Sequence, residues 1–372
     1  MHYCGVFAAV LILNTLTYSI IVPVYNRPDE VDELLQSLCQ QTVNDFEVII
    51  VEDGSTVTCK DVCNKYADIL NLHYYNKPNS GPGQSRNYGA ERASGEWLII
   101  LDSDVIIPSH YLAAIQNYIM KGAEGEAFGG PDCAHPSFTP VQKAISYSMT
   151  SFFTTGGIRG GKGKKMDKFY PRSYNMGIRR DVYQELGGFS NMRFGEDIDF
   201  SYRIIEAGHK TALFPEAWVW HKRRTDFRKF FRQVYNSGRA RINLMKRHPG
   251  TLKIVHLLPT IFTVGVIALI LISAVGRLLM HYVDPDRFRW LCLAPWIPIL
   301  LYSGIILIDS TIRNRSLHVG LLSVPAAFTQ LMGYGLGFIQ AWWQRCVLRK
   351  DEFPHSQQSE AERKAFEKNF YK

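Results

Sequence analysis

Cysteine is scarce in this chain of 372 residues, and its seven cysteines stand far apart. Their number is odd, they form no C-x-x-C pair, and Cys59 and Cys63 have no histidine nearby in the sequence. A disulfide framework and a structural zinc site are therefore not expected, and a reduced, cytosol-facing compartment fits this usage. Internal repeats and low-complexity tracts are also missing. Because 46% of the residues are apolar, most of the chain is expected to fold.

Charge is unevenly distributed. The chain has 42 basic and 34 acidic residues, a net charge of +8. Between Lys222 and Lys253 eleven residues are Lys or Arg and one is acidic, so this segment carries +10 and the rest of the chain −2. A basic protein can bind nucleic acid. A basic belt beside an apolar run instead favours anionic lipid headgroups, so we expect membrane lipids and no nucleic acid as partners.

Three long segments without a formal charge follow the basic belt. They cover residues 254–276, 290–308 and 316–344. At about 1.5 Å per residue, each is long enough to cross a bilayer core of about 30 Å. The third contains Pro325 and Gln330, so the sequence leaves open whether it spans or lies in the interface.

The remaining chain divides at these features. Residues 1–17 form an apolar extension of uncertain role, and residues 345–372 form a charged tail. Residues 223–253 form a basic amphipathic segment, in which residues 226–248 are expected to be a helix lying on the membrane.

Short apolar strands and helices alternate in the region before the basic belt. Strands are expected at 18–24, 46–51, 72–75 and 97–101, and helices at 29–41, 60–70 and 83–93. Apolar strands separated by helices predict an α/β fold with a mostly parallel sheet covered by helices on both faces. In such sheets ligands bind at the carboxyl ends of the strands.

Acidic residues stand at two of these strand ends. Asp53 closes the second strand, and Asp102 and Asp104 follow the fourth. Paired carboxylates suit Mg²⁺ or Mn²⁺, especially when a diphosphate supplies further oxygen ligands. A turn or a helix cap is the alternative interpretation of the pair.

Two further groups belong to the same pattern. Glu196 and Asp197 precede an expected helix at 200–207, where acids also serve as ordinary helix caps. His221 ends the aromatic run W-V-W, and a single histidine is more often structural than a ligand. Beside a divalent cation, however, an imidazole nitrogen is a reasonable additional ligand.

Five stretches between residues 18 and 221 resemble glycosyltransferase family 2, and the C-terminal segments make the chain similar to its membrane-anchored bacterial type. The stretches are SIIVPVYNRPDEVDELLQSL, VIIVEDGS, GPGQSRNYGAERASGEWLIILDSD, YNMGIRRDVYQELGGF and GEDIDFSYRI. The resemblance implies the Rossmann-like GT-A fold and a catalytic domain at 18–222.

The resemblance also implies roles in donor binding. Pro23 and Tyr25 would border the nucleotide base. Asp53 would hydrogen-bond the base, in a motif whose usual first Asp is Glu52 here. Arg86 would face the donor nucleotide.

The resemblance implies that a divalent cation, Mn²⁺ or Mg²⁺, takes part in catalysis. Asp102 and Asp104 would bind the cation and the donor, with Asp104 as the direct ligand and His221 as a metal or diphosphate contact. Asp197 would be the general base that deprotonates the acceptor, and Glu196 would orient it or bind acceptor.

The expected activity is an inverting transfer of one sugar from a UDP-, GDP- or dTDP-sugar to a lipid-linked or nascent glycan acceptor. It would occur at the cytoplasmic face of the inner membrane, in a multi-pass protein. One alternative is a processive polysaccharide synthase, whose Q-x-x-R-W motif is represented here by Gln233 without the Arg and Trp. Another is a catalytically silent module that binds nucleotide-sugars, although its expected signature, the loss of the acids, is not found.

Overall fold

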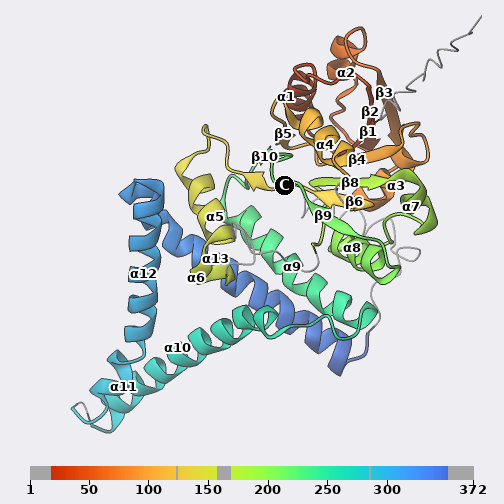
Figure 1. The fold of residues 1–372 in the computed structure, drawn as a ribbon. Helices are drawn as coiled ribbons and strands as arrows, with labels where there is room; N and C mark the ends of the chain where they lie inside the picture. The colour runs from red at the N-terminus through yellow and green to blue at the C-terminus, as the bar shows by residue number, and fades with distance from the viewer. Residues whose placement is uncertain (1–17, 123–124, 157–168, 285, 351–372) are drawn as a thin grey trace, which may run out of the picture.

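The computed structural model describes residues 18–122, 125–156, 169–284 and 286–350. The N-terminal extension and residues 351–372 of the charged tail lie outside the described residues. Figure 1 shows an α/β domain, at the upper right, joined to a group of long helices that extends to the lower left.

A seven-stranded sheet forms the centre of the α/β domain, in the order β3-β2-β1-β4-β8-β6-β9. Its strands are β1 (Tyr18–Val24), β2 (Phe46–Asp53), β3 (Leu72–Lys77), β4 (Trp97–Leu101), β6 (Ala127–Gly129), β8 (Asn175–Arg179) and β9 (Thr211–Leu213). The first four are parallel, which confirms the predicted sheet. Strand β8, which was not predicted, runs antiparallel between β4 and β6.

Helices cover both faces of this sheet. Side chains alternate along each buried strand, so apolar residues lie on both faces and both must be shielded from water. The covering helices are α1 (Pro28–Leu38), α2 (Lys60–Tyr66), α3 (Pro82–Ala90), α4 (Tyr111–Met120), α7 (Arg180–Glu185) and α8 (Glu196–Glu206). Ile20 packs on one face with Leu34 of α1. Its neighbour Ile21 packs on the other with Phe200 of α8.

Several expected helix boundaries were wrong. Helices α1, α2 and α3 end at Leu38, Tyr66 and Ala90, three or four residues early. Helix α8 begins at Glu196, not at residue 200, so both acids lie inside its first turn. Gly195, with a φ of +81°, turns the chain directly before the helix, and the exposed N–H groups of the first turn favour acidic side chains there.

A second, three-stranded sheet adjoins the end of β4. Strand β10 (Val219–His221) lies between β5 (Val105–Ile106) and β7 (Asp132–Cys133). Its register pairs His221 with Val105. Because Val105 directly follows Asp104, this small sheet brings His221 to the carboxyl end of β4.

The second part of the molecule is made of helices, most of them long. They are α5 (Pro140–Thr150), α6 (Phe152–Thr155), α9 (Phe227–Arg247), α10 (Leu258–Tyr282), α11 (Arg289–Leu293), α12 (Trp296–Asn314) and α13 (Leu317–Trp342), with short turns of 3₁₀ helix at Ile254–His256 and π-helix at Trp343–Val347. Helix α9 confirms the helix predicted at 226–248. Helix α10 starts later than its predicted segment, with Pro259 in its first turn, and continues beyond Arg277.

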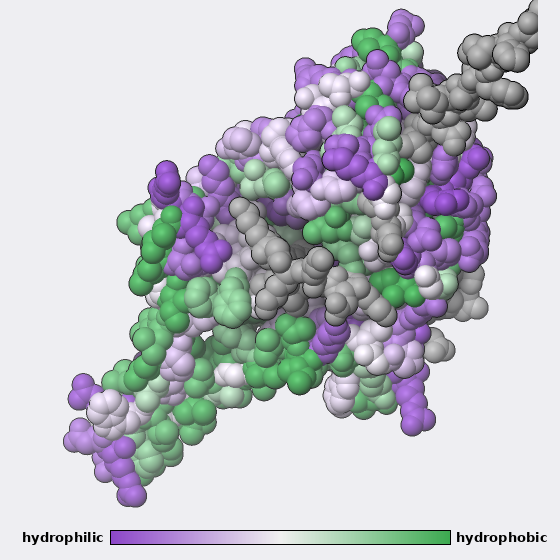
Figure 2. All heavy atoms as spheres, in the orientation of Figure 1, coloured by the Kyte–Doolittle hydropathy of each residue, from purple (hydrophilic) through white to green (hydrophobic). Residues whose placement is uncertain are grey.

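Three helical segments are long and apolar enough to span a membrane by length and composition. They are Leu258–Tyr282, Arg289–Asn314 and Leu317–Val347. Within their most apolar parts, 17%, 11% and 44% of the residues are buried in the protein. Figure 2 shows hydrophobic surface over α10 and α12, and hydrophilic residues at the tip between them.

Helices α9 and α13 lie side by side and run in the same direction (Figure 1). Phe227 at the start of α9 packs against the cluster that contains Val319, and Ile242 near its end packs with Phe338. Between these contacts, a Cβ on Gly238 would lie 2.1 Å from a backbone oxygen of α13. The glycine therefore permits a close approach of the two helices.

Candidate active site

Two carboxylates and an imidazole converge at the carboxyl end of β4. Asp102 and Asp104 flank the turn into β5, and the Asp104 side chain is 9% exposed. The His221 Nε2 atom lies 3.2 Å from Asp104 Oδ1. Ligand atoms of all three residues lie within 4.8 Å of one another. The structure thus brings together the three predicted metal ligands.

The surroundings of His221 fit a divalent cation. Its ring stacks on Tyr174, with 5.1 Å between the centroids. Its Nδ1 atom is buried and has no hydrogen-bond partner among the described residues; Asp132 Oδ2 lies 3.9 Å away. Carboxylates with an imidazole form a donor set that suits Mn²⁺ or Mg²⁺.

Cationic side chains surround Asp104. One Arg27 guanidinium nitrogen lies 2.5 Å from Asp104 Oδ2, and one of Arg224 lies 3.9 Å from the same oxygen. Burial acts to raise the pKa of Asp104, but Arg27, followed by His221 and Arg224, holds that pKa well below its ordinary value. The carboxylate therefore stays ionised and is ready to bind a cation.

Arg86 connects the candidate metal ligands to the second acidic motif. Its side chain is 4% exposed. One terminal nitrogen donates to Asp102 Oδ1 at 2.8 Å and the other to Glu196 Oε1 at 2.9 Å. The guanidinium thus lies between two acids of the chain itself, and its expected contact with a donor nucleotide stays a prediction.

Glu196 and Asp197 are buried in the first turn of α8, and their pKa values shift in opposite directions. Burial raises the pKa of Glu196 to about 7, with Arg86 opposing the shift and Asp197 adding to it. Burial also acts to raise the pKa of Asp197. The positive charge of Arg172, which donates to Asp197 Oδ2 at 2.6 Å, outweighs the effect of burial, so the pKa of Asp197 lies below its ordinary value.

The residues expected to border a nucleotide base lie at the ends of β1 and β2. Pro23 is buried in β1, and Tyr25 is partly buried just beyond it. Asp53 accepts hydrogen bonds from Lys77 and from the backbone N–H groups of Ser80 and Gly81, the latter two at 2.9 Å. The base-binding roles of all three predicted residues stay predictions.

Sequence reasoning missed the arginines that hold the acids. Arg27 follows Tyr25 and Asn26 in the first motif, and Arg172 stands just before the fourth. Arg27 lies within a motif and Arg172 lies next to one, and these positions could have marked both as candidate site residues. The motifs themselves do not reveal which acid each arginine pairs with.

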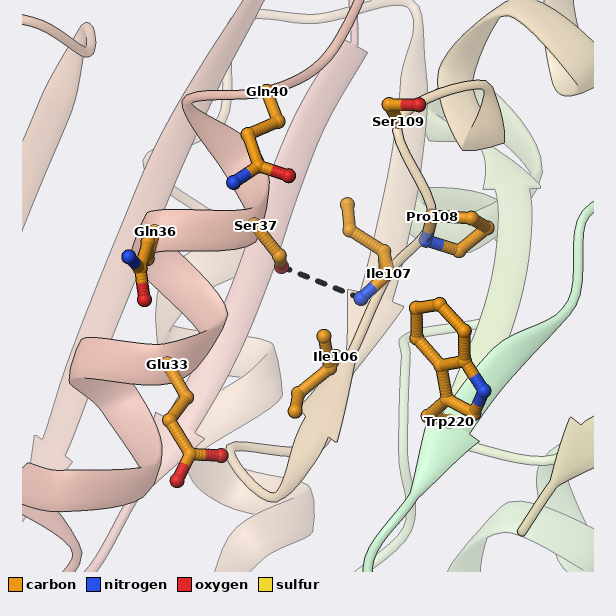
Figure 3. Close-up of a pocket in the computed structure, with 9 residues that line it drawn as sticks. All are labelled: Glu33, Gln36, Ser37, Gln40, Ile106, Ile107, Pro108, Ser109 and Trp220. Carbon is orange, nitrogen blue, oxygen red and sulfur yellow. Dashed lines mark hydrogen bonds between the residues drawn. The ribbon is translucent and has the colours of Figure 1, made fainter. Parts of the chain in front are cut away.

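A pocket of about 410 Å³ lies close to the metal cluster but is separate from it. Its lining is Glu33, Gln36, Ser37, Gln40, Ile106, Ile107, Pro108, Ser109 and Trp220 (Figure 3). Trp220 and His221 are neighbours in β10, and successive side chains of a strand point to opposite faces. The pocket and the cluster therefore lie on opposite sides of the small sheet.

Part of the α/β domain matches a known protein family. Residues 19–187 match the family described as "Glycosyl transferase family 2". An uncharacterized glycosyltransferase of Haemophilus influenzae is 31% identical over 205 residues, which is 50% of this chain and 62% of that protein. A validoxylamine A glucosyltransferase of Streptomyces hygroscopicus subsp. jinggangensis is 37% identical over 229 residues, 54% of each chain.

A solved structure supports the fold. The mannosyltransferase PcManGT from Pyrobaculum calidifontis, in complex with GDP-Man and Mn²⁺, superimposes with a TM-score of 0.52 at 15% identity, covering 88% of this chain and 87% of that one. The chain spans less than two thirds of the curated relatives described above. Residues 19–187 thus match the model of glycosyltransferase family 2, and the domain has the GT-A fold.

Removing the Arg86 guanidinium should destabilise the fold strongly. In Arg86→Gln, Asp102 and Glu196 lose their shared partner, and breaking such a buried ion pair typically costs about 3–5 kcal/mol. The control is Arg179→Gln, because Arg179 forms an ion pair with Asp181 in which both side chains are largely exposed. That change should cost at most about 1 kcal/mol. Thermal unfolding in detergent measures both, and equal losses would contradict the bridging role of Arg86.

Proposed function

We propose that this protein is a membrane-bound glycosyltransferase that moves one sugar from a nucleotide-sugar to a membrane-borne acceptor, with inversion at the anomeric carbon. The acceptor is a lipid-linked or nascent glycan, and the donor is a UDP-, GDP- or dTDP-sugar. The observation that carries the proposal is the cluster of Asp102, Asp104 and His221, joined through Arg86 to Glu196.

Asp102, Asp104 and His221 are the residues that would hold a divalent cation, Mn²⁺ or Mg²⁺. When bound, the cation offsets the negative charge that develops on the departing diphosphate. Support comes from the donor set and from the similarly folded mannosyltransferase, which was solved with GDP-Man and Mn²⁺.

The acids of α8 would act on the acceptor. The acceptor hydroxyl oxygen bonds to the anomeric carbon, the bond from that carbon to the diphosphate oxygen breaks, and the oxygen keeps the electron pair. Asp197 takes the hydroxyl proton, since its lowered pKa keeps it ionised at neutral pH. Glu196 orients the acceptor. Direct attack from the side opposite the leaving group inverts the anomeric centre.

The membrane anchor would be a hairpin made of α10 and α12. Helix α10 has 25 residues, and at about 1.5 Å per residue it is about 37 Å long, more than the roughly 30 Å of a bilayer core. Large apolar side chains such as Ile261, Leu271 and Leu300 are exposed on the two helices. The tip carries Asp286 and Arg287, which are exposed and hydrophilic.

Helix α13 would lie in the membrane interface and would not span. It runs along α9, which carries Arg228 and Lys229 at one end and Lys246 and Arg247 at the other. A helix with charges at both ends and at Arg239 between them is disfavoured in the hydrocarbon core, because each buried charge is costly there. Its partner α13 must then remain at the same depth.

This arrangement places basic residues on one side of the bilayer. With two spans, Arg313 before α13 and Lys350 after it both lie on the side of the catalytic domain, as the positive-inside rule favours for the cytoplasm. Fewer cations of the basic belt are available to lipid than the sequence predicted, since several of them contact side chains of the α/β domain. Examples are Arg223, which pairs with Asp132, Arg224, which lies near Asp104, and Arg241, which bonds Tyr202 of α8.

Two variants separate the metal site from the base. Wild-type protein in detergent, given a panel of nucleotide-sugars and a lipid extract as acceptor, should release nucleotide from one donor in a manner that depends on Mn²⁺ or Mg²⁺. Asp104→Ala should abolish the metal-dependent turnover. Asp197→Asn should keep donor binding but lose about 10²- to 10⁴-fold in rate, the usual contribution of a general base.

Calorimetric titration of the donor provides the control for both variants. Unchanged turnover in Asp104→Ala would remove Asp104 from the metal site. A collapse of donor affinity in Asp197→Asn would make Asp197 a binding residue.

The protonation of Glu196 should appear in the pH profile of transfer. Because the pKa of Glu196 is raised to about 7, its ion pair with Arg86 weakens as the pH falls through 7. The rate should therefore decline below an inflection near pH 7. Glu196→Gln should remove this inflection, and Glu91→Gln, a change at an exposed surface glutamate, should retain it. An inflection that persists in Glu196→Gln would assign it to another group.

Cysteine labelling tests the two-span topology. The native cysteines other than the buried Cys59 and Cys63 are first replaced by serine. Arg287→Cys at the hairpin tip and Lys350→Cys after α13 are then treated with a membrane-impermeant maleimide in vesicles of known orientation. We expect them to react from opposite sides. Reaction of both from the same side would show that α13 spans.

A further inference from the structure

The carboxylate of Asp104 belongs both to the candidate cation site and to an ion pair with arginine. The cation site requires one oxygen of Asp104, and His221 lies 3.2 Å from Oδ1, while Oδ2 is held by Arg27 at 2.5 Å, with Arg224 at 3.9 Å. A guanidinium and a divalent cation a few ångströms apart repel each other strongly in a buried site. Arg27 therefore has to leave Asp104 when the cation binds.

The backbone that carries Arg27 is held firmly in place. Asn26 adopts a φ of +52°, and its side-chain oxygen accepts from the backbone N–H groups of Thr56 (2.8 Å) and Val57 (2.9 Å). Its own N–H donates to Ser55 Oγ at 2.7 Å. Because this position is tied to the loop after β2, a displaced Arg27 side chain swings within the site while its Cα stays fixed.

The charge of the site indicates what the displaced guanidinium binds next. Without a cation, the charge of Asp104 is neutralised by Arg27. Once a divalent cation binds Asp104 in place of Arg27, the site has an excess of positive charge. A nucleotide-sugar brings a diphosphate with at least two negative charges to the same place. Guanidinium and phosphate form charge-assisted, often bidentate hydrogen bonds, which makes the diphosphate a suitable new partner.

We propose that Arg27 exchanges its ion pair with Asp104 for the donor diphosphate, so that the cation and the nucleotide bind cooperatively. The proposal rests on the proposed function and names Arg27 as a donor-binding residue that also excludes the cation until a nucleotide is present. Arg224, near the same oxygen, is placed to assist it. A cation alone then binds weakly, because it competes with a guanidinium.

Binding measurements on Arg27→Gln test this exchange without any turnover. Mn²⁺ alone is titrated into wild type and variant, followed by UDP, GDP and dTDP with and without Mn²⁺. In the variant, affinity for Mn²⁺ alone should rise about tenfold or more, and affinity for the nucleoside diphosphate in the presence of Mn²⁺ should fall by a similar factor, as expected for loss of a charge-assisted hydrogen bond. The enhancement of Mn²⁺ binding by nucleotide should shrink accordingly.

Two further variants serve as controls. Arg179→Gln removes an arginine whose carboxylate partner is Asp181, away from Asp104, and should leave all affinities unchanged. Arg27→Lys keeps the charge without the planar fork and should give intermediate values.

Each outcome decides a separate point. An unchanged Mn²⁺ affinity in Arg27→Gln would overturn the competition, and a raised Mn²⁺ affinity with unchanged nucleotide affinity would overturn the diphosphate contact. Failure of wild type to bind any of the three nucleotides would instead contradict the proposed function, while the Mn²⁺ titration would still report on Arg27.

Discussion

Mutual repulsion among buried carboxylates is the constraint on which this site depends. Asp104, Glu196 and Asp197 all lie at one edge of the sheet and are largely shielded from water. Such a group persists only when cations neutralise it. Arg86 bridges two of the acidic motifs, and the remaining acids have guanidinium partners of their own. The arginines therefore hold the acids in position, and they lower the pKa values of Asp104 and Asp197 while burial raises that of Glu196.

The same need for pairing joins α8 to the long helices. His248, which follows α9, is buried, and its two ring nitrogens lie 3.0 Å from Asp199 and 2.9 Å from Glu206, both on α8. Arg241 of α9 reaches Tyr202 of α8 at 3.1 Å. Displacement of α9 would therefore also move α8, whose first turn holds Asp197, the expected general base.

Local sequence predicted the elements and the acids, whereas the partners of the acids depend on the fold. Strands β1 and β4 were predicted with correct ends because they are apolar runs that stop at distinct residues. Strand β8 was missed, since its short sequence is stabilised by pairing with β4 and β6. Arg27 is 77 residues from Asp104, and Arg86 is 110 from Glu196, so no local pattern reveals these pairs.

The basic segment that follows β10 supplies arginines to the candidate site and exposed basic residues to α9. Arg223 and Arg224 turn toward Asp132 and Asp104, while Arg228 and Lys229 are exposed on α9. Helix α9 begins six residues after His221, and an extended residue spans at most about 3.6 Å, so the cluster lies within about 22 Å of its start. If α9 lies on the bilayer, the cluster is then no more than about 22 Å from the level of α9. The glycan of the proposed lipid-linked acceptor would have to bridge that distance, while its lipid part stays in the membrane.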